Sequence, residues 1–462
     1  MLPVAVIVEK KEEKKEAKEL EKIKVRCGVF FDGTLNNRDN TNARIADDDN
    51  YNDNKVEKKD NSYENDSTNI AKMEKYIDDK APGFKFSVAT YIEGPGTETY
   101  DADETFGYAF GTMGTGVKAK VHRGMVKLVN LLSKAFNGEK YIIEELVIDV
   151  FGFSRGAAGA RFFIHEVFNE ESSFMHYQGQ TIEFPANPLF LRLQRDGHTI
   201  TADNVSFAFA GLYDTVASYG VPFWDSGTRL LKLDSLKDSR VKKVIHLVAA
   251  DEHRANFPST NIASAGVRGT EIFLPGVHSD LGGSYLKNSD EFMIINRAYK
   301  METLEADRQI LIEQGWYEPG EIFIDEASVY SRYFTISGHV APDKEAQHHL
   351  CVRKTGINNY YDKIPMNIMA DFAEEHKVPL IPEFRDDFKV HEDVNSAFDV
   401  LTAYSKGASE LSDWFEKTEP TWLTTLRHNS FHFSAHYTLS FGIAPNKPNF
   451  DDDRRIRDFI PG

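Results

Sequence analysis

The chain has 462 residues, of which 41% are hydrophobic, and a formal net charge of −18. It is long enough for a large packed core with insertions, and its acidic excess argues against nucleic acid as a partner and against general adhesion to anionic lipid. Two cysteines, Cys27 and Cys351, are too few for a disulfide framework. They predict reduced thiols in a protein made in the cytosol, and we expect no secretory signal after the short apolar start.

The N-terminal part is expected to form a charged tail or solvated helix over residues 1–24, followed by a strand over residues 25–31. Asp32-Gly33-Thr34 then suggests a haloacid-dehalogenase-type phosphatase, but that chemistry needs a second acid where Thr34 stands. We predict instead that this loop supplies an oxyanion-hole N–H from Gly33, with Asp32 fixing the turn. An ordinary Asx turn is the alternative.

The next part is expected to begin with a long exposed polar insertion over residues 36–66. Ser67 is predicted to cap a helix that runs to about Lys80, and residues 84–92 are predicted to form a strand. Residues 117–136 have apolar positions spaced by three and four, which predicts an amphipathic helix.

The most informative stretch lies between residues 144 and 169. An apolar strand leads into Gly152-x-Ser154-x-Gly156, and a helix is predicted to follow. Ser154 would lie at the apex of a strained turn as a nucleophile, and the glycines would leave room for the returning backbone. The N–H of Arg155, at the start of the helix, would face a developing oxyanion. The alternative is a chance occurrence of the pentapeptide.

Three later strands are predicted over residues 205–210, 243–250 and 271–274. Asp214 and His278 follow the first and the last of them, where parallel sheets place functional groups. The order Ser154, Asp214, His278 is that of nucleophile, acid and base in α/β-hydrolases. His278 would accept the serine proton, and Asp214 would orient its imidazole. Alternatives remain open: Asp203 or Asp251 for the acid, and for the base His246, His428, His432 or His436.

Beyond about Lys287 the sequence pattern becomes less regular. A helix is predicted over residues 290–314, an extended segment over 332–340 and a partly alternating strand over 431–441. This part is expected to be a cap, a lipid-facing lobe or a peripheral helical layer. We therefore predict three parts: the tail 1–24, a catalytic core 25–290 and a C-terminal region 291–462.

The predicted fold class is α/β, with a mostly parallel sheet flanked by helices as in α/β-hydrolases, large insertions and a C-terminal cap or peripheral lobe. Asp280 is expected to pin the loop that carries His278. The sequence contains no metal-binding motif, so we expect no metal and no cofactor in catalysis.

Four motifs together give the chain a resemblance to one family: Phe31-Asp32-Gly33-Thr34, Gly152-Phe153-Ser154-Arg155-Gly156-Ala157, Tyr213-Asp214-Thr215-Val216 and His278-Ser279-Asp280-Leu281-Gly282-Gly283. The chain resembles the phospholipase effectors of the bacterial type VI secretion system, in the clade with a G-x-S-x-G elbow. The resemblance covers about residues 25–290.

This resemblance implies an antibacterial lipase that releases fatty acids from membrane phospholipids. It implies delivery by a carrier protein on the secretion needle into a neighbouring cell's periplasm, and neutralisation by a cognate immunity protein. It maps the triad onto Ser154, Asp214 and His278. Two other readings of the same residues are a serine esterase for small soluble esters and a non-catalytic binding protein on a hydrolase fold.

Overall fold

The structure is a computed structural model of the chain. It describes residues 19–54, 62–103, 115–177, 180–184, 188–217, 226–255, 257–326, 348–407, 420–437 and 457–462. The predicted extended segment 332–340, residues 1–18 of the expected tail and residues 438–441 of the last predicted strand lie outside these ranges.

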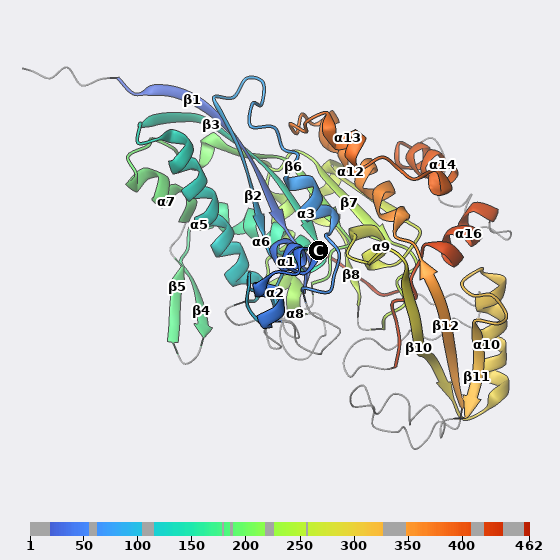
Figure 1. Cartoon of the computed structure of the whole chain (residues 1–462). Helices are drawn as coiled ribbons and strands as arrows, with labels where there is room; N and C mark the ends of the chain where they lie inside the picture. The colour runs from blue at the N-terminus through green and yellow to red at the C-terminus, as the bar shows by residue number, and fades with distance from the viewer. Residues whose placement is uncertain are drawn as a thin grey trace, which may run out of the picture.

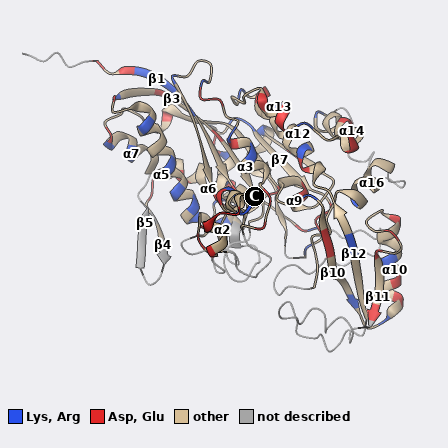
Figure 2. Ribbon diagram, viewed as in Figure 1, with Lys and Arg blue, Asp and Glu red and all other residues tan. Residues whose placement is uncertain are grey.

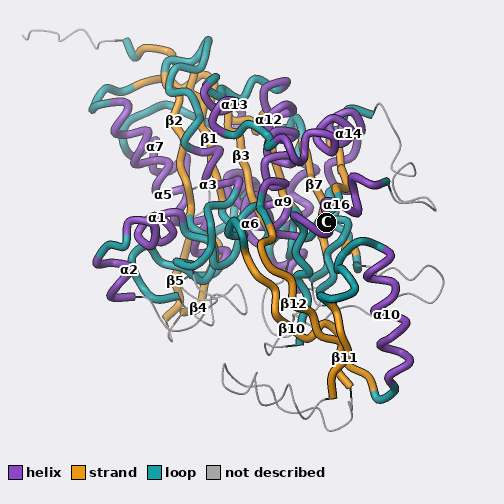
Figure 3. Tube along the Cα trace, turned by 45° about the vertical axis from the view of Figure 1, so that its right-hand side comes forward, coloured by secondary structure: helices purple, strands orange, loops and turns teal. Residues whose placement is uncertain are grey.

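A six-stranded parallel sheet forms the centre of the molecule (Figures 1 and 3). Its strand order is β2-β1-β3-β6-β7-β9. The strands are β1 (Glu21–Phe31), β2 (Phe86–Ile92), β3 (Tyr141–Phe153), β6 (Val205–Tyr213), β7 (Val244–Ala249) and β9 (Gly269–Leu274). Each was predicted from its apolar run, and the mixed α/β class with a mostly parallel sheet is confirmed.

Helices cover both faces of this sheet, so the molecule has three layers. On one face, α5 (Val117–Phe136), α6 (Arg155–Phe168) and α7 (Pro188–Arg195) bury their apolar sides against the strands in one core cluster. On the other face, α3 (Asn69–Glu74) and α12 (Lys363–Glu375) share a second core cluster with the same sheet. The helix over residues 117–136 has the predicted bounds.

The C-terminal region supplies much of the second face. A three-stranded antiparallel sheet of β10 (Ser289–Ala298), β12 (His348–Ile357) and β11 (Ile322–Glu326) lies beside α10 (Met301–Glu313). Helices α13 (Glu383–Asp387), α14 (Asn395–Ser405) and α16 (Thr421–Asn429) join α12 along the same side (Figure 1). Buried residues of this region belong to the same core cluster as residues of the main sheet. The region therefore forms a helical layer on the main sheet, with a small sheet beside it.

Shorter elements complete the described chain: α1 (Arg38–Ala46), α2 (Asp49–Asn54), the hairpin β4 (Ser173–Tyr177) and β5 (Gln180–Phe184), α8 (Ser226–Leu230), β8 (Ser259–Thr260), α9 (His278–Gly282) and β13 (Phe459–Ile460). Short 3₁₀ turns lie at Ala202–Asn204, Leu233–Lys237, Ala263–Arg268, Tyr360–Asp362 and Glu392–Val394. Figure 2 shows acidic side chains on α2 and basic side chains on α5, so these two helices carry opposite charges.

Three local predictions are wrong. The expected helix over residues 290–314 is strand β10 followed by the shorter α10. The expected exposed insertion contains α1 and α2, and Asn40 and Thr41 on α1 are buried. The helix predicted from Ser67 to about Lys80 is the shorter α3, which ends at Glu74. Its N-cap is Thr68, whose hydroxyl accepts the Ala71 N–H.

The boundaries expected at residues 24/25 and 290/291 fall inside β1 and β10, and the division into three parts stays a prediction. Among the described residues, no helix combines the length and the apolar character that a bilayer crossing requires. Both cysteines are buried and free.

The contact between α6 and β1 gives a test of the fold. A Cβ added at Gly156 would lie 2.2 Å from the main-chain oxygen of Asp32 and 2.3 Å from that of Phe31. We expect Gly156→Ala to lower the free energy of unfolding by about 3 kcal/mol, because rigid backbone must move. Urea denaturation measures this loss.

Gly159→Ala on the same helix is the matched control. Its added Cβ would meet neighbours only at 3.6–3.8 Å, which is ordinary contact. Replacing a glycine inside a helix by alanine is expected to stabilise by about 0.5–1 kcal/mol. Equal effects of the two substitutions would contradict the close approach of α6 to β1.

Candidate active site

Ser154 lies between the end of β3 and the start of α6, as the sequence predicts. Its backbone has φ 59° and ψ −126°, a conformation that costs an L-residue energy. Its N–H donates to the Tyr213 carbonyl at 2.9 Å, and its own carbonyl accepts the Ala157 N–H at 3.0 Å. These bonds hold the turn between the neighbouring strand and the new helix, and the serine is 3% exposed.

The two glycines of the motif are required by close backbone contacts. A Cβ at Gly152 would lie 2.5 Å from the Gly156 carbonyl oxygen, and one at Gly156 would collide with the end of β1. The turn is therefore tight enough that α6 starts directly against the strand it leaves. Arg155 is the first residue of α6, a position whose N–H has no acceptor within the helix.

Asp32 follows β1 and is buried beside the start of α6. Its carboxylate accepts hydrogen bonds from the Tyr91 hydroxyl at 2.5 Å, the Thr68 hydroxyl at 2.7 Å and the Gly33 N–H at 2.7 Å. Burial raises the pKa of Asp32 to about 6, although these three donors oppose the rise. Asp32 thus anchors the turn, as predicted.

The Gly33 N–H is not available for the oxyanion-hole role predicted for it. This N–H is already paired with the Asp32 carboxylate, so in this structure it does not point to an oxyanion. The loop is nevertheless next to the elbow, because a Cβ at Gly33 would lie 2.6 Å from the Phe153 ring. The following residue, Thr34, has a buried hydroxyl with no hydrogen-bond partner among the described residues. Sequence reasoning missed Thr34 as a polar group that this loop offers.

Asp214 and His278 are brought together by the sheet. Phe153 on β3 pairs with Tyr213 on β6, so Ser154 and Asp214 leave adjacent strands at the same edge. His278 begins α9 after β9, and its Nδ1 lies 2.5 Å from Asp214 Oδ2. The imidazole lies against the Phe153 ring, with ring centroids 4.5 Å apart. The ring is thus fixed beside the residue that precedes Ser154.

His278 Nε2 and Ser154 Oγ are not joined by a hydrogen bond within the described part of the chain. Such bonds are often long in hydrolases without substrate and shorten when substrate binds. Asp214 and His278 are almost fully buried, at 0% and 4% exposed. The arrangement provides an oriented imidazole beside a strained serine turn.

Three charged residues that the sequence analysis did not select complete the electrostatics of the site. Arg457 Nη1 lies 2.6 Å from Asp214 Oδ1, and the Ala249 N–H donates to the same oxygen at 3.2 Å. Glu252 accepts the His278 backbone N–H at 3.2 Å and pairs with Arg254 at 2.8 Å. Glu252 and Arg254 follow β7 at the same sheet edge, a position that could have been used to find them.

The charges around His278 set its protonation. Burial alone would raise the pKa of Asp214, yet the Arg457 charge and the hydrogen bond from His278 hold it well below its usual range. Burial lowers the pKa of His278, and the bond to Asp214 partly opposes this. A neutral imidazole beside an ionised carboxylate is the state that a general base requires.

The alternative acids lie elsewhere. Asp203 lies in the 3₁₀ turn before β6, at the opposite edge of the sheet from Asp214. Asp251 accepts the Gly276 N–H at 2.7 Å and pairs with Arg427 at 3.2 Å. Neither is hydrogen-bonded to His278 in the described structure.

The alternative bases have other partners. His246 lies within β7, where its Nδ1 is 2.9 Å from Glu271 and its Nε2 accepts the Thr215 N–H at 2.9 Å. His428 on α16 lies 3.0 Å from Glu321. His436 is half-buried near Arg254, and desolvation lowers its pKa to about 4. Among these histidines and His278, only His278 is bonded to Asp214 in the described chain.

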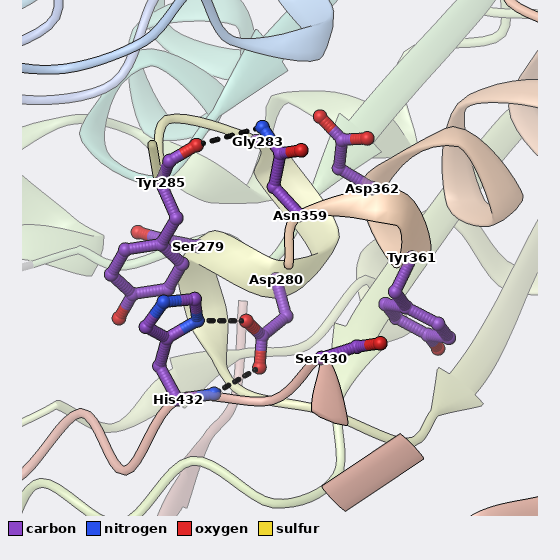
Figure 4. A pocket seen from close by; sticks show the side chains of 9 residues that line it. All are labelled: Ser279, Asp280, Gly283, Tyr285, Asn359, Tyr361, Asp362, Ser430 and His432. Atoms are coloured by element: carbon purple, nitrogen blue, oxygen red, sulfur yellow. Dashed lines mark hydrogen bonds and ion pairs between the residues drawn. The ribbon is translucent and has the colours of Figure 1, made fainter. Parts of the chain in front are cut away.

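His432 belongs to a second Ser–His–Asp series, partly shown in Figure 4. Its Nε2 lies 2.6 Å from Ser289 Oγ, and its Nδ1 lies 3.0 Å from Asp280 Oδ1. Asp280 Oδ2 also accepts the Val277 N–H at 3.0 Å, so Asp280 pins the start of α9 as predicted. Burial raises the pKa of Asp280 well above its usual range, which disfavours the carboxylate that such a series needs.

The cavity of Figure 4 is lined by Asp280, Tyr285 and His432 but not by Ser154, Asp214 or His278. Ser289 starts strand β10 and has no strand–turn–helix around it, unlike Ser154. In the part of the chain that the structure describes, no three His, Cys, Asp or Glu side chains are placed to hold a metal ion.

The backbone of Ser154 gives a stability test. A glycine adopts φ 59° without the cost that a Cβ imposes, whereas alanine keeps that cost. We expect Ser154→Gly to be about 1 kcal/mol more stable to urea than Ser154→Ala, after allowing for the greater freedom of glycine in the unfolded chain. A glycine variant less stable than the alanine variant would contradict a strained turn.

The family model of the T6SS phospholipase effector Tle1-like catalytic domain matches residues 26–305. No curated protein sequence matches the chain. A solved structure of the Tle1 effector bound to the VgrG spike of the type VI secretion system is similar, with 22% identity, a TM-score of 0.61 and coverage of 96% of this chain and 94% of that chain.

An uncharacterised protein from Pseudomonas aeruginosa is also similar, with 18% identity and a TM-score of 0.40 over 85% of this chain and 52% of that one. The likeness to the Tle1 structure shows a common fold. The family model spans more than half of the chain and includes the strands that carry Ser154, Asp214 and His278. The chain therefore belongs to the Tle1-like phospholipase effectors of the type VI secretion system, a family of hydrolases.

Proposed function

We propose that the protein is a serine hydrolase that cleaves acyl esters of membrane phospholipids, a phospholipase of the A type. The observation that carries the proposal is the Asp214–His278 pair, 2.5 Å apart, at the sheet edge where the strained Ser154 turn leaves the neighbouring strand. Family membership supports phospholipid as the substrate class.

In this proposal Ser154 Oγ attacks the acyl carbonyl carbon while His278 Nε2 accepts its proton. Asp214 holds the imidazole through Nδ1 and stabilises the imidazolium that forms. The Arg155 N–H at the start of α6 stabilises the oxyanion. The loop of Gly33 and Thr34 contributes through the Thr34 hydroxyl, since the Gly33 N–H is paired with the Asp32 carboxylate. His278 then protonates the leaving alcohol, and water releases the fatty acid by the reverse sequence of proton transfers.

Family membership supports a wider role for the protein. The related Tle1 effector is bound to a VgrG spike, which supports a carrier of the same kind for this chain. We propose that the type VI system delivers the protein into the periplasm of a competing bacterium, where its lipase activity is antibacterial. A cognate immunity protein would protect the producing cell. Small soluble esters are the alternative substrate class for the same site.

The direct test is fatty-acid release from phosphatidylethanolamine and phosphatidylglycerol vesicles. We expect Ser154→Ala and His278→Ala to reduce the rate by about 10³-fold or more, since each removes a member of the triad. Asp203→Asn is the matched control for Asp214→Asn, because Asp203 lies at the far edge of the sheet. It is expected to keep wild-type activity, while Asp214→Asn loses about 10³–10⁴-fold.

Unchanged release by Ser154→Ala would contradict the nucleophile. If the protein hydrolyses short-chain monomeric esters and its rate is no higher on vesicles, small soluble esters are the substrate class instead of phospholipids. If Asp203→Asn loses as much activity as Asp214→Asn, the role proposed for Asp214 is contradicted.

A further inference from the structure

We propose that Arg457, in the C-terminal segment, is a positioning residue that holds Asp214 in the orientation needed by His278. The inference rests on the proposed function, because it assigns to Arg457 a part in the same Ser154–Asp214–His278 site. Arg457 lies outside the residues matched by the family model.

The contact between Arg457 and Asp214 is short, buried and specific for one oxygen. Nη1 lies 2.6 Å from Asp214 Oδ1, while His278 takes Oδ2. Arg457 Nε also donates to the Phe257 carbonyl at 2.6 Å, and the side chain is 4% exposed. Because the two carboxylate oxygens have different cationic or polar partners, the rotation of the carboxyl group is fixed.

The main chain around Arg457 is tied to the same part of the fold. Strand β13 pairs in parallel with β8, and the Ser259 N–H donates to the Asp458 carbonyl at 3.0 Å. The Thr260 N–H in β8 donates to the Thr215 carbonyl at 2.9 Å, in the residue after Asp214. The C-terminal segment, β8 and the loop of Asp214 are therefore one continuous hydrogen-bonded layer.

The nucleophile's helix contacts this layer as well. Arg161 on α6 is fully buried and donates to the Asn261 carbonyl at 2.9 Å, next to β8. The Asn261 N–H in turn donates to the Ile460 carbonyl at 3.0 Å. Arg457 thus enters the site on a segment that is anchored both to the loop of Asp214 and to the middle of α6.

Charge gives Arg457 a second effect. The charged groups facing His278 are Asp214 on one side and Glu252 with Arg254 on the other, and Phe153 and Phe257 flank the ring. Arg457 balances part of the Asp214 charge. Without it, Asp214 would attract a proton on His278 more strongly, and the pKa of His278 would rise.

The protonation of His278 determines how activity depends on pH. The active base is neutral His278, so activity falls as pH decreases through the pKa of that histidine. We expect Arg457→Gln to shift the acidic limb of the kcat/KM profile upward by about 0.5–1 pH unit. At neutral pH, kcat is expected to fall about 10–100-fold, by analogy with residues that orient metal ligands through hydrogen bonds, with little change in KM.

The experiment compares Arg457→Gln, Arg457→Lys and a control, Arg268→Gln. Lysine keeps the charge and is expected to restore most of the activity and most of the pH profile. Among the described residues, Arg268 donates to the main-chain carbonyls of residues 236, 237, 238 and 241 and not to Asp214. Its variant therefore also loses a guanidinium but leaves the partner of Asp214 in place. It is expected to keep the wild-type profile.

A second readout does not depend on turnover. NMR titration of the His278 imidazole, assigned by comparison with His278→Gln, is expected to show a higher pKa in Arg457→Gln than in the wild type. An unchanged pKa and an unchanged pH profile would overturn the inference. If the wild type hydrolyses no ester tested, the proposed function fails, while the NMR titration still decides the role of Arg457.

Discussion

The site depends on the close approach between the start of α6 and the end of β1. At Gly156 the two backbones are so near that a single Cβ would lie 2.2 Å from the Asp32 carbonyl oxygen. This approach forces the chain to turn sharply after β3, and the turn places Ser154 at positive φ above the sheet. It also places the Asp32–Gly33 loop beside the start of α6 and the Phe153 ring. One steric constraint thus fixes the serine and the loop opposite it.

The remaining geometry follows from the parallel sheet. Since β3 and β6 are neighbours, Ser154 and Asp214 leave the sheet side by side, and β9 returns His278 to the same edge. Burying these charges is costly unless each has a partner. Asp214 lies between His278 and Arg457, and Glu252 lies between Arg254 and the His278 backbone. The buried charges are thus paired before substrate arrives.

Much of the fold and of the candidate site could be predicted from the sequence, because the signals lie in short stretches of the chain. Each central strand is a short apolar run, and the spacing of Gly152, Ser154 and Gly156 records a backbone contact that only glycine permits. Strand β10 was predicted as part of a helix, because the short apolar run Met293-Ile294-Ile295 fits both the helical and the strand periodicity. The burial of Asn40 was missed because hydrogen bonds to Ser62 and the Glu98 carbonyl, rather than apolar contacts, stabilise it. Arg457 is separated from Asp214 by 243 residues, and no local pattern reports such a contact.

The central claim is that Ser154, rather than Ser289 in the second Ser–His–Asp series, is the nucleophile. Labelling of the folded full-length protein with a fluorophosphonate probe, followed by peptide mass spectrometry, tests it most directly. The account predicts a covalent adduct on Ser154 that disappears in Ser154→Ala and persists in Ser289→Ala. An adduct on Ser289, or no adduct on Ser154 in folded protein, would contradict it.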